Sequence, residues 1–219
     1  MDQPAEIFPL TVEELMQLYL SIKPQIEARI VDFRRIWETA SDEELFLELV
    51  FCLLTPQSKA TTCWKAVQRL ERKCMITEAA PAQISESLVG VRFHLRKGEY
   101  ICLARNMFSS RSLKATLAEF AGPAAAREWL VENVKGLGYK EASHFLRNIG
   151  LCEDLAILDR HILKNLALLG VIKEVPTSPT KRMYLEIERK MTAFSIEAKI
   201  PMGHLDLLLW YKEAGEVFK

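Results

Sequence analysis

Apolar side chains recur at every third or fourth position along most of the chain, which is the spacing of amphipathic helices. The alternation of apolar and polar positions that marks a half-buried strand barely occurs. Short breaks that carry turn residues separate the periodic segments. These segments lie at about 93–107, 113–120, 124–133, 140–149, 160–169, 181–194 and 202–214. The sequence therefore predicts an all-α fold.

Two capping boxes mark helix starts in the amino-terminal part of the chain. Thr11 is followed by Glu14, and Ser41 is followed by Glu44, at the spacing in which each side chain bonds the backbone amide of the other. The second box precedes the apolar run 45–54. That run is long enough to form a buried central helix.

Two single residues predict further helix starts in the same region. Pro24 suits the first turn of a helix through 25–37, because an N–H at that position would have no partner in the helix. Ser58 is expected to cap a helix through 59–73.

The composition limits the size of the core and says little about partners. At 219 residues, of which 49% are hydrophobic, the chain can bury one good core or two small ones. The formal net charge is zero, but a local basic face can still bind phosphates. The alternative is that the basic residues occupy solvated helix faces. The unevenly placed cations are Arg34, Arg35, Lys59, Arg92, Arg96, Lys97, Lys135, Lys140, Arg147, Arg160 and Lys164.

The cysteines are widely spaced and odd in number, which favours reduced thiols in a cytosolic protein over a disulfide framework. They are Cys52, Cys63, Cys74, Cys102 and Cys152. No Cys-X-X-Cys pair occurs, so they predict no metal site. No apolar stretch approaches the roughly 18 to 20 residues of a membrane span. Residues 1–10 lack the basic and then apolar pattern of a signal peptide. We therefore expect a cytoplasmic protein with no membrane partner.

The stretch VKGLGYK, residues 134–140, is the most informative in the chain. One helical pattern ends at it and another begins after it, and Gly136 and Gly138 permit positive φ and a close approach of backbone. Such a hairpin directs bare N–H groups outward, which suits a phosphate. Lys140 opens the second helix, where a cation opposes the helix dipole and the neutral amine of a nucleophile is favoured. The alternative for Lys140 is an exposed surface lysine.

Asp159 stands directly before the apolar pattern of 160–169, and aspartate there is a natural N-cap. A catalytic role is compatible with capping, since a capping carboxylate is fixed in place and held anionic by helix amides. His161 is expected to be structural or to face DNA, because no second ligand stands at a metal-binding spacing from it.

These motifs resemble the helix–hairpin–helix DNA glycosylase superfamily, and within it the archaeal and bacterial second group of 8-oxoguanine DNA glycosylase/AP lyases. The resemblance covers 47–219. Its tightest matches are VKGLGYKEASHFLRN (134–148), ILDRHI (157–162) and HLDLLLWYKEAGEVFK (204–219). The endonuclease III relatives carry four clustered cysteines for an iron–sulfur cluster. No cysteine follows Cys152 here, so no such cluster and no cofactor are expected.

The resemblance implies a mechanism. The damaged nucleotide is flipped out of the duplex. Asp159 stabilises positive charge that develops at C1′, and neutral Lys140 attacks C1′ to form a Schiff base that permits β-elimination. It also implies two lobes with the active cleft between them. The helical barrel carrying the hairpin would span 123–194, and the other lobe would combine 1–122 with the carboxy-terminal helix at 195–219.

The turn between the two apolar helices at 45–54 and 59–73 is expected to contact DNA. In glycosylase relatives this junction supplies a polar side chain that fills the gap left by the flipped base, so Gln57 is the candidate. Lys59 would contact phosphate rather than read sequence, as would Arg160. An ordinary capped turn led by Ser58 is the alternative of equal weight.

The tail is expected to recognise the base. Trp210 lies in a helical run where tryptophan is usually core, but its face can also stack on a purine. In the family an aromatic side chain near the terminus stacks on the damaged base and a second opposes it, which Phe93 fits. The family's terminal lysine helps distinguish 8-oxoguanine from guanine, and here that residue is Lys219, whose α-carboxylate is a candidate acceptor. Asp206 could bond the base or be solvated.

The sequence thus predicts a bifunctional, monomeric enzyme that acts on double-stranded DNA containing 8-oxoguanine in the cytoplasm, at the nucleoid. A superfamily enzyme for another oxidised base, such as a pyrimidine, is the first alternative. A non-catalytic helix–hairpin–helix DNA-binding module is the second. Such a module needs the glycines but neither Lys140 nor Asp159, so the presence of both residues counts against it.

Overall fold

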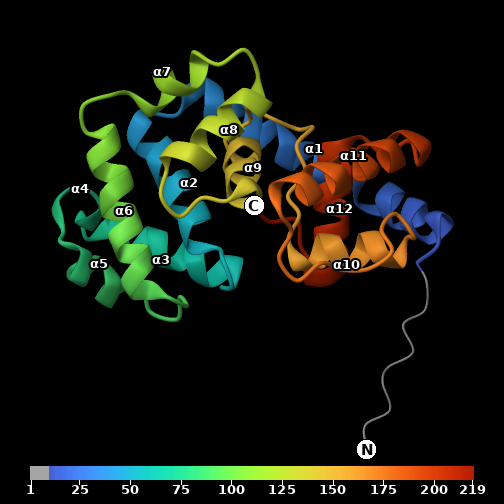
Figure 1. Cartoon of the computed structure of the whole chain (residues 1–219), viewed down its shortest axis with the longest axis horizontal. Coiled ribbons are helices and arrows are strands. Elements are labelled where there is room, and N and C mark those ends of the chain that lie inside the picture. Colours follow the sequence, from blue (N-terminus) through green and yellow to red (C-terminus); the bar gives the residue numbers. More distant parts are fainter. Residues whose placement is uncertain (1–9) are drawn as a thin grey trace, which may run out of the picture. The chain divides into compact units, whose positions relative to one another are not determined.

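The structure, a computed structural model, describes residues 10–219, and all regular structure in that range is helical (Figure 1). The predicted all-α fold is confirmed. Residues 1–9, most of the stretch considered above as a signal peptide, lie outside the described residues. The helices are α1 (Val12–Thr39), α2 (Asp42–Leu54), α3 (Ala60–Arg72), α4 (Met75–Glu78), α5 (Pro81–Ser87), α6 (His94–Phe108), α7 (Leu113–Ala118), α8 (Pro123–Asn133), α9 (Tyr139–Asn148), α10 (Arg160–Leu168), α11 (Lys181–Glu197) and α12 (Met202–Ala214).

The chain divides into two compact units. Among the described residues, unit 1 comprises 10–32 and 153–218, and unit 2 comprises 33–152 together with Lys219. The predicted lobe boundaries at 122/123 and 194/195 are not the boundaries of these units, and the two functional lobes stay a prediction.

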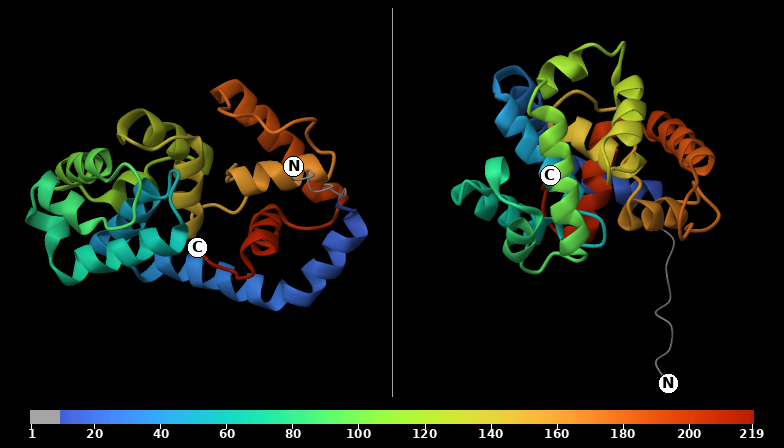
Figure 2. Two further views of the ribbon diagram at one scale, coloured as in Figure 1. Left: turned by 90° about the horizontal axis from the view of Figure 1, so that it is seen from below. Right: turned by 60° about the vertical axis from the view of Figure 1, so that its left-hand side comes forward.

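Unit 2 is built around α2. Its apolar side chains are almost all buried, as the run 45–54 predicts, and Ser41 and Glu44 form the predicted capping box at its start. Helices α3, α6, α7 and α9 pack against it, while α4 and α5 lie beside α6 (Figures 1 and 2). The short helices α4 and α5 carry too few turns to show a period, which is why the sequence did not predict them.

In unit 1, α12 packs against both α10 and α11, and Tyr19 of α1 reaches its first turn. The Tyr19 hydroxyl and Nδ1 of His204 lie 2.9 Å apart. Glu213 joins α12 to α10, since its carboxylate accepts bonds from Lys164 Nζ at 3.0 Å and from Asn165 Nδ2 at 3.1 Å. These contacts fix the start of α10, where Asp159 stands, relative to α12.

Two predicted helix starts are wrong. Pro24 lies inside one continuous helix, α1, instead of opening a second. It forfeits one backbone bond, but the helix continues because Ile22 and Ile26 on either side of it are buried on one face. Ser58 does not cap α3, which Lys59 precedes without a side-chain cap bond. The Ser58 hydroxyl is instead used by residues of another segment, described below.

Within residues 10–219 no helix is both long enough and apolar enough to cross a membrane. Cys52, Cys63, Cys102 and Cys152 are buried and Cys74 is exposed, all as free thiols. Burial raises the pKa of Cys52 well above its usual value, and raises that of Cys63 to about 11.

Candidate active site

The hairpin between α8 and α9 requires glycine at its first position. Gly136 has a φ of +99°, and a Cβ built on it would lie 2.4 Å from the ring of Tyr100. Both the backbone conformation and the ring of α6 therefore exclude a side chain. Gly138 precedes α9 as its N-cap in extended conformation.

The hairpin amides are less bare than the sequence predicts. The N–H of Leu137 donates to the carbonyl of Val134 at 3.1 Å, and the N–H of Gly138 donates to Oε2 of Glu141 at 3.3 Å. Glu141 therefore occupies part of the place that a phosphate would take in a complex.

Lys140 lies in the first turn of α9, and its side chain is only 20% exposed. Its Nζ donates to Thr55 Oγ1 at 3.2 Å and lies 3.7 Å from Glu141 Oε1. Thr55 is buried at the carboxy-terminal end of α2, and its hydroxyl donates to the carbonyl of Cys52 at 2.9 Å. Lys140 is therefore a directed amine with a fixed neighbour, which excludes the interpretation of a free surface lysine.

Asp159 caps α10, as the sequence predicts. Its Oδ1 accepts the amides of His161 and Ile162, both at 2.8 Å. The carboxylate is thus held by the helix end and belongs to unit 1. Arg160 follows as an exposed side chain whose Nε lies 3.4 Å from His161 Nε2. His161 Nδ1 lies 3.6 Å from Glu213 Oε2, which agrees with a structural histidine.

Two exposed candidate side chains of unit 2 stand on strained backbone. Gln57 has a φ of +55° and Phe93 a φ of +57°, a region that residues with a side chain rarely adopt. Phe93 is 54% exposed, and the guanidinium of Arg92 lies 5.7 Å from its ring centroid. Lys59, the residue before α3, is exposed as well.

The side chain of Lys219 is enclosed within unit 2. Its ammonium pairs with the buried carboxylate of Glu48 and lies 3.1 Å from the ring centroid of Trp64 and 5.8 Å from that of Phe51. Asn148 Nδ2 donates to the other Glu48 oxygen at 3.2 Å. Lys219 is therefore not the loose surface tail that a terminal residue usually forms.

His144 lies one turn after Lys140 on α9, fully inside unit 2. Burial, followed by the nearby cations of Lys140 and Arg147, lowers the pKa of His144 well below its ordinary value. The backbone of Lys219 acts to raise this pKa and does not prevail. The ring stands edge-on to Phe51, with 5.5 Å between centroids. A neutral imidazole therefore lies beside the backbone of Lys219.

The remaining base-recognition candidates lie on α12 in unit 1. Trp210 is half-buried, so it is neither a full core residue nor a free one. Asp206 is only 5% exposed, which excludes the solvated alternative for it.

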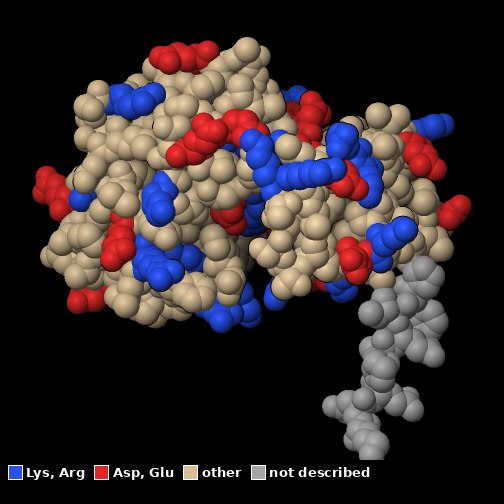
Figure 3. Space-filling view, in the orientation of Figure 1, with Lys and Arg blue, Asp and Glu red and all other residues tan. Residues whose placement is uncertain are grey.

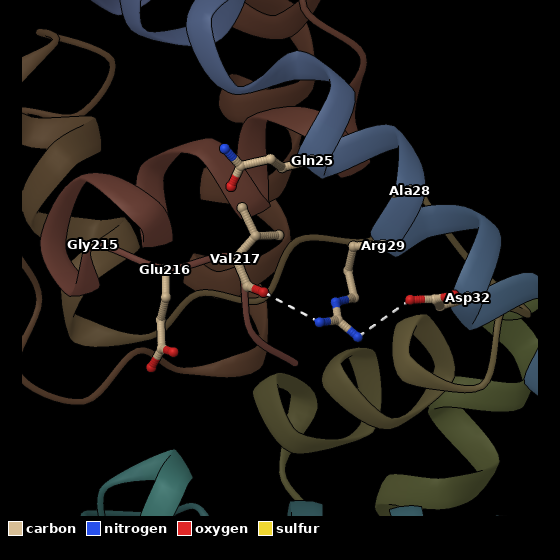
Figure 4. A pocket seen from close by; sticks show the side chains of 7 residues that line it. All are labelled: Gln25, Ala28, Arg29, Asp32, Gly215, Glu216 and Val217. Atoms are coloured by element: carbon tan, nitrogen blue, oxygen red, sulfur yellow. Dashed lines mark hydrogen bonds and ion pairs between the residues drawn. The ribbon is translucent and has the colours of Figure 1, made fainter.

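The tail after α12 runs along α1 inside unit 1. Arg29 Nη2 donates to the carbonyl of Val217 at 3.4 Å, and Arg29 Nη1 lies 3.5 Å from Asp32 Oδ2 (Figure 4). A shallow cavity of about 440 Å³ opens beside this contact. Arg29 thus fixes the backbone two residues before Lys219.

The sequence did not single out Thr55, Glu48, His144 or the lysine of α6, Lys97, as site residues. Glu48 is a charged residue in an otherwise buried apolar run, a signal that the printed sequence does contain. Lys97 follows five exposed residues, 92–96, so the sequence carries no such signal for it. Thr55 and His144 carry no such signal, because only the packing of α9 on α2 brings them to Lys140 and Lys219.

Among residues 10–219, no group of three or more His, Cys, Asp or Glu side chains is arranged to hold a metal ion. In the view of Figure 3, Lys and Arg side chains form separate groups with Asp and Glu side chains between them. Lys97 and Arg147, two of the cations expected on a basic face, are buried and cannot contact phosphate. For the other cations the local basic face stays a prediction.

Comparison with known proteins assigns the family. The family model for 8-oxoguanine DNA glycosylase matches residues 26–200. An 8-oxoguanine DNA glycosylase/AP lyase of Fusobacterium nucleatum is 44% identical over 94% of this chain and 96% of its own. The crystal structure of the Methanocaldococcus jannaschii 8-oxoguanine glycosylase/lyase, in complex with a 15mer DNA containing 8-oxoguanine, superposes with a TM-score of 0.87. It is 37% identical and covers 95% of this chain and 99% of its own.

A more distant structure shows the fold alone. The Helicobacter pylori 3-methyladenine DNA glycosylase, 14% identical, matches with a TM-score of 0.61 over 94% of this chain and 99% of its own. The family model and the relatives of 44% and 37% identity confirm the family expected from the hairpin, from Asp159 and from the tail. The chain belongs to the 8-oxoguanine DNA glycosylase/AP lyases of the helix–hairpin–helix superfamily.

Proposed function

We propose that this protein flips 8-oxoguanine out of double-stranded DNA, excises it, and cleaves the strand at the resulting abasic site. The observation that carries the proposal is Lys140: it stands at the mouth of the hairpin, with its amine partly buried and directed at Thr55. A DNA-binding module without activity has no use for an enclosed amine at this place. The family's shared name for both steps supports the same conclusion.

Lys140 acts as the nucleophile. Its neutral amine forms a bond to C1′ as the N-glycosidic bond breaks, and the base departs with the bonding electrons and takes up a proton. Opening of the sugar ring gives a Schiff base between Nζ and C1′. Loss of a proton from C2′ then expels the 3′ phosphate, and water releases the lysine. The sequence of steps needs no metal and no nucleotide cofactor.

Asp159 stabilises the positive charge that builds at the sugar when the glycosidic bond breaks. The amides of His161 and Ile162 hold the Oδ1 atom of its carboxylate. A carboxylate fixed in this way needs no reorganisation when the charge develops, which is the condition for effective electrostatic stabilisation.

The base is held by aromatic side chains and the tail. Phe93 stacks on one face and Trp210 on the other, and Asp206 and the α-carboxylate of Lys219 accept hydrogen bonds from the purine edge. The Lys219 side chain serves as an anchor in this scheme, since Glu48 and Trp64 already hold its ammonium.

Contacts with the duplex come from the hairpin and from exposed polar side chains. The backbone at Gly136 and Gly138 approaches a phosphate, and Lys59 and Arg160 contact others. Gln57 fills the gap in the duplex. We further propose that the protein acts as a monomer with lobes at 1–122 plus 195–219 and 123–194. Its place of action is the nucleoid in the cytoplasm, where its five thiols stay reduced.

A duplex-cleavage assay with borohydride trapping tests the proposal. The panel pairs 8-oxoguanine with each of the four bases, and adds an oxidised pyrimidine, undamaged guanine and a preformed abasic site. We expect excision of 8-oxoguanine, cleavage at the abasic site, and a covalent adduct with both. Excision of the oxidised pyrimidine in preference to 8-oxoguanine would assign the alternative lesion class. Binding to the duplexes with neither excision nor adduct would assign the module.

A further inference from the structure

The ammonium of Lys97, on α6, is buried in the interior of unit 2. The residue is only 4% exposed, and its Nζ donates to three oxygens of the segment that ends α2 and begins α3. These are the carbonyls of Leu54 and Pro56, both at 2.7 Å, and the hydroxyl of Ser58 at 3.2 Å. Lys97 therefore uses its donors to hold the Thr55–Ser58 turn closed.

The same cluster ties this turn to the start of α6. The Ser58 hydroxyl also accepts the amide of Arg92 at 3.0 Å. This bond is the reason that Ser58 does not cap α3. Gln57 thus lies inside a turn clamped by Lys97, and Phe93 follows directly after a residue that is bonded to that turn.

Gln57 and Phe93 both need such a clamp. Each has positive φ, which costs on the order of 1 to 3 kcal/mol for a residue with a side chain and persists only where the surroundings enforce it. Both side chains are exposed, so their own packing contributes little to holding the backbone. The amide of Ser58 closes the turn by donating to the carbonyl of Thr55 at 3.0 Å, and the bonds from Lys97 and from Arg92 to Ser58 add the constraint that ties this turn to α6.

Fold stability alone does not account for a lysine at this position. The pKa of Lys97 is lowered to about 8, mainly by burial; Cys63 and Glu141 act to raise it, and the cations of Lys140 and Arg92 act to lower it. An apolar side chain of similar length would avoid the desolvation of an ammonium. The ammonium is a single group that bonds all three oxygens at once, in addition to the Cys63 thiol on the Leu54 carbonyl and the Arg92 amide on the Ser58 hydroxyl.

We propose that Lys97 is a positioning residue of the glycosylase step, which fixes Gln57 and Phe93 in the geometry that flips and stacks the damaged base. The proposal rests on the proposed function. Thr55, in contrast, does not depend on Lys97, because its own amide and hydroxyl bond the carbonyl of Cys52 in α2. Loss of Lys97 should therefore impair recognition of the base much more than the chemistry of Lys140.

The test compares Lys97→Met and the milder Ser58→Ala with the parent. Excision is measured on an 8-oxoguanine duplex and β-elimination on a preformed abasic duplex. Unstacking is followed by 2-aminopurine fluorescence next to the lesion, in a Lys140→Gln background. We expect Lys97→Met to lower 8-oxoguanine excision by about 10- to 100-fold, the size of effect that a misplaced positioning group produces. The fluorescence change should be lost, and abasic cleavage should fall by less than about threefold.

Arg105→Met is the matched control. Arg105 lies on the same helix and donates to the carbonyls of Ala79 and Ile76, at 2.8 and 3.4 Å, away from the clamped turn. Arg105→Met should lower the free energy of unfolding but leave the rate of 8-oxoguanine excision unchanged. Ser58→Ala should act in the direction of Lys97→Met, and the two effects should be non-additive because they break one network.

Three results would overturn the proposal. The first is that Lys97→Met excises 8-oxoguanine near the parent rate. The second is that Lys97→Met lowers excision and abasic cleavage equally. The third is that Arg105→Met lowers excision as much as Lys97→Met does. A parent that is inactive on both duplexes would overturn the proposed function as well. Hydrogen exchange of the amides at 55–59 and 92–93 tests the clamp without DNA, and so independently of the proposed function. Exchange there should quicken at least about tenfold in Lys97→Met and not in Arg105→Met.

Discussion

The ammonium of Lys140 donates a 3.2 Å hydrogen bond to the hydroxyl of Thr55, a residue 85 positions earlier in the chain. The contact exists because α9 packs against α2, and the hairpin glycines start α9 at the right place. The Thr55 hydroxyl donates its proton to the carbonyl of Cys52, so its oxygen accepts the hydrogen bond from Lys140 with a lone pair. An amine that donates a proton in this way keeps its own lone pair free once it is neutral.

Replacement of the nucleophile is the first prediction. Lys140→Gln should abolish strand cleavage and the adduct trapped by borohydride, while binding of undamaged duplex stays within about threefold of the parent, because the hairpin backbone is unchanged. Gel-based trapping and fluorescence anisotropy measure the two effects. Lys135→Gln, an exposed lysine of the same hairpin, is the control and should retain the adduct. An adduct of parental yield from Lys140→Gln would exclude Lys140 as the nucleophile.

Asp159 allows its two roles to be separated. Asp159→Asn should keep the helix cap, because asparagine caps about as well as aspartate, whereas Asp159→Ala should cost about 1 kcal/mol of stability. Both should lower excision by about 100- to 1000-fold, since each removes the negative charge that faces the developing cation. Thermal unfolding and single-turnover excision measure this. If Asp159→Asn excised at nearly the parental rate, Asp159 would be only a cap.

Removal of Lys219 should affect both stability and recognition. Its ammonium pairs with the buried Glu48, so deletion strands a buried carboxylate and should cost about 3 to 5 kcal/mol. This cost contradicts the expectation for an ordinary terminal residue, and it would blur any test of recognition.

Adding Glu48→Gln to the deletion removes the stranded charge and should restore most of the stability. Recognition should still be lost, so the double variant should no longer prefer 8-oxoguanine over guanine. Its cleavage of a preformed abasic site should stay close to that of the parent. The preference is measured as the ratio of excision rates on the 8-oxoguanine and guanine duplexes. A ratio equal to that of the parent would mean that residues other than Lys219 recognise the base.

Glu213 makes the stability of unit 1 depend on pH. Burial acts to raise its pKa, but hydrogen bonds from Lys164 and Asn165 outweigh burial, and the pKa lies below the ordinary 4.5. The carboxylate therefore stabilises the fold fully above pH 4.5, and this contribution is lost as the pH falls through the lower folded-state pKa. Relative to the parent, Glu213→Gln should lose roughly 1.5 to 3 kcal/mol at pH 7. Urea unfolding should show this difference shrinking below pH 4.5, and a constant difference would contradict the assignment.

The affinity for undamaged duplex should fall steeply with salt despite the net charge of zero. Phosphate contacts release counterions, so four to six of them would reduce affinity by roughly 100-fold or more between 50 and 200 mM salt. Anisotropy titrations at four salt concentrations give the slope. Lys59→Gln should reduce the slope by about one phosphate contact, and a slope near zero would exclude a DNA-binding face of this kind.

Much of the fold could be predicted from the sequence because helix signals are local. The capping boxes and the Asp159 cap depend on residues within one turn of each other, and the structure confirms each of them. Of the hairpin glycines, Gly136 has positive φ and Gly138 does not. The interpretations of Pro24 and Ser58 were wrong because distant residues decide both. Buried side chains carry α1 through its proline, and Arg92 with Lys97 takes the hydroxyl that would cap α3.

The residues of the candidate site also divide into those that local motifs indicate and those that only distant contacts reveal. Lys140 and Asp159 follow from motifs, whereas Thr55, Glu48 and Lys97 become visible only when α2, α6 and the tail residue meet in unit 2. A buried charge in an apolar run is the one sequence signal that could have indicated one of these residues, Glu48. It does not say which partner the charge has.

The buried thiols bear on how such an enzyme withstands the conditions that create its substrate. Oxidants attack the thiolate form of cysteine. Cys63 donates its proton to the carbonyl of Leu54, the same oxygen that Lys97 holds, and its pKa of about 11 leaves almost no thiolate at neutral pH. Cys52, beneath Thr55, is protonated for the same reason. Peroxide that oxidises guanine therefore finds Cys52 and Cys63 unreactive near Lys140, the proposed nucleophile, and the exposed Cys74 is the thiol expected to be modified first.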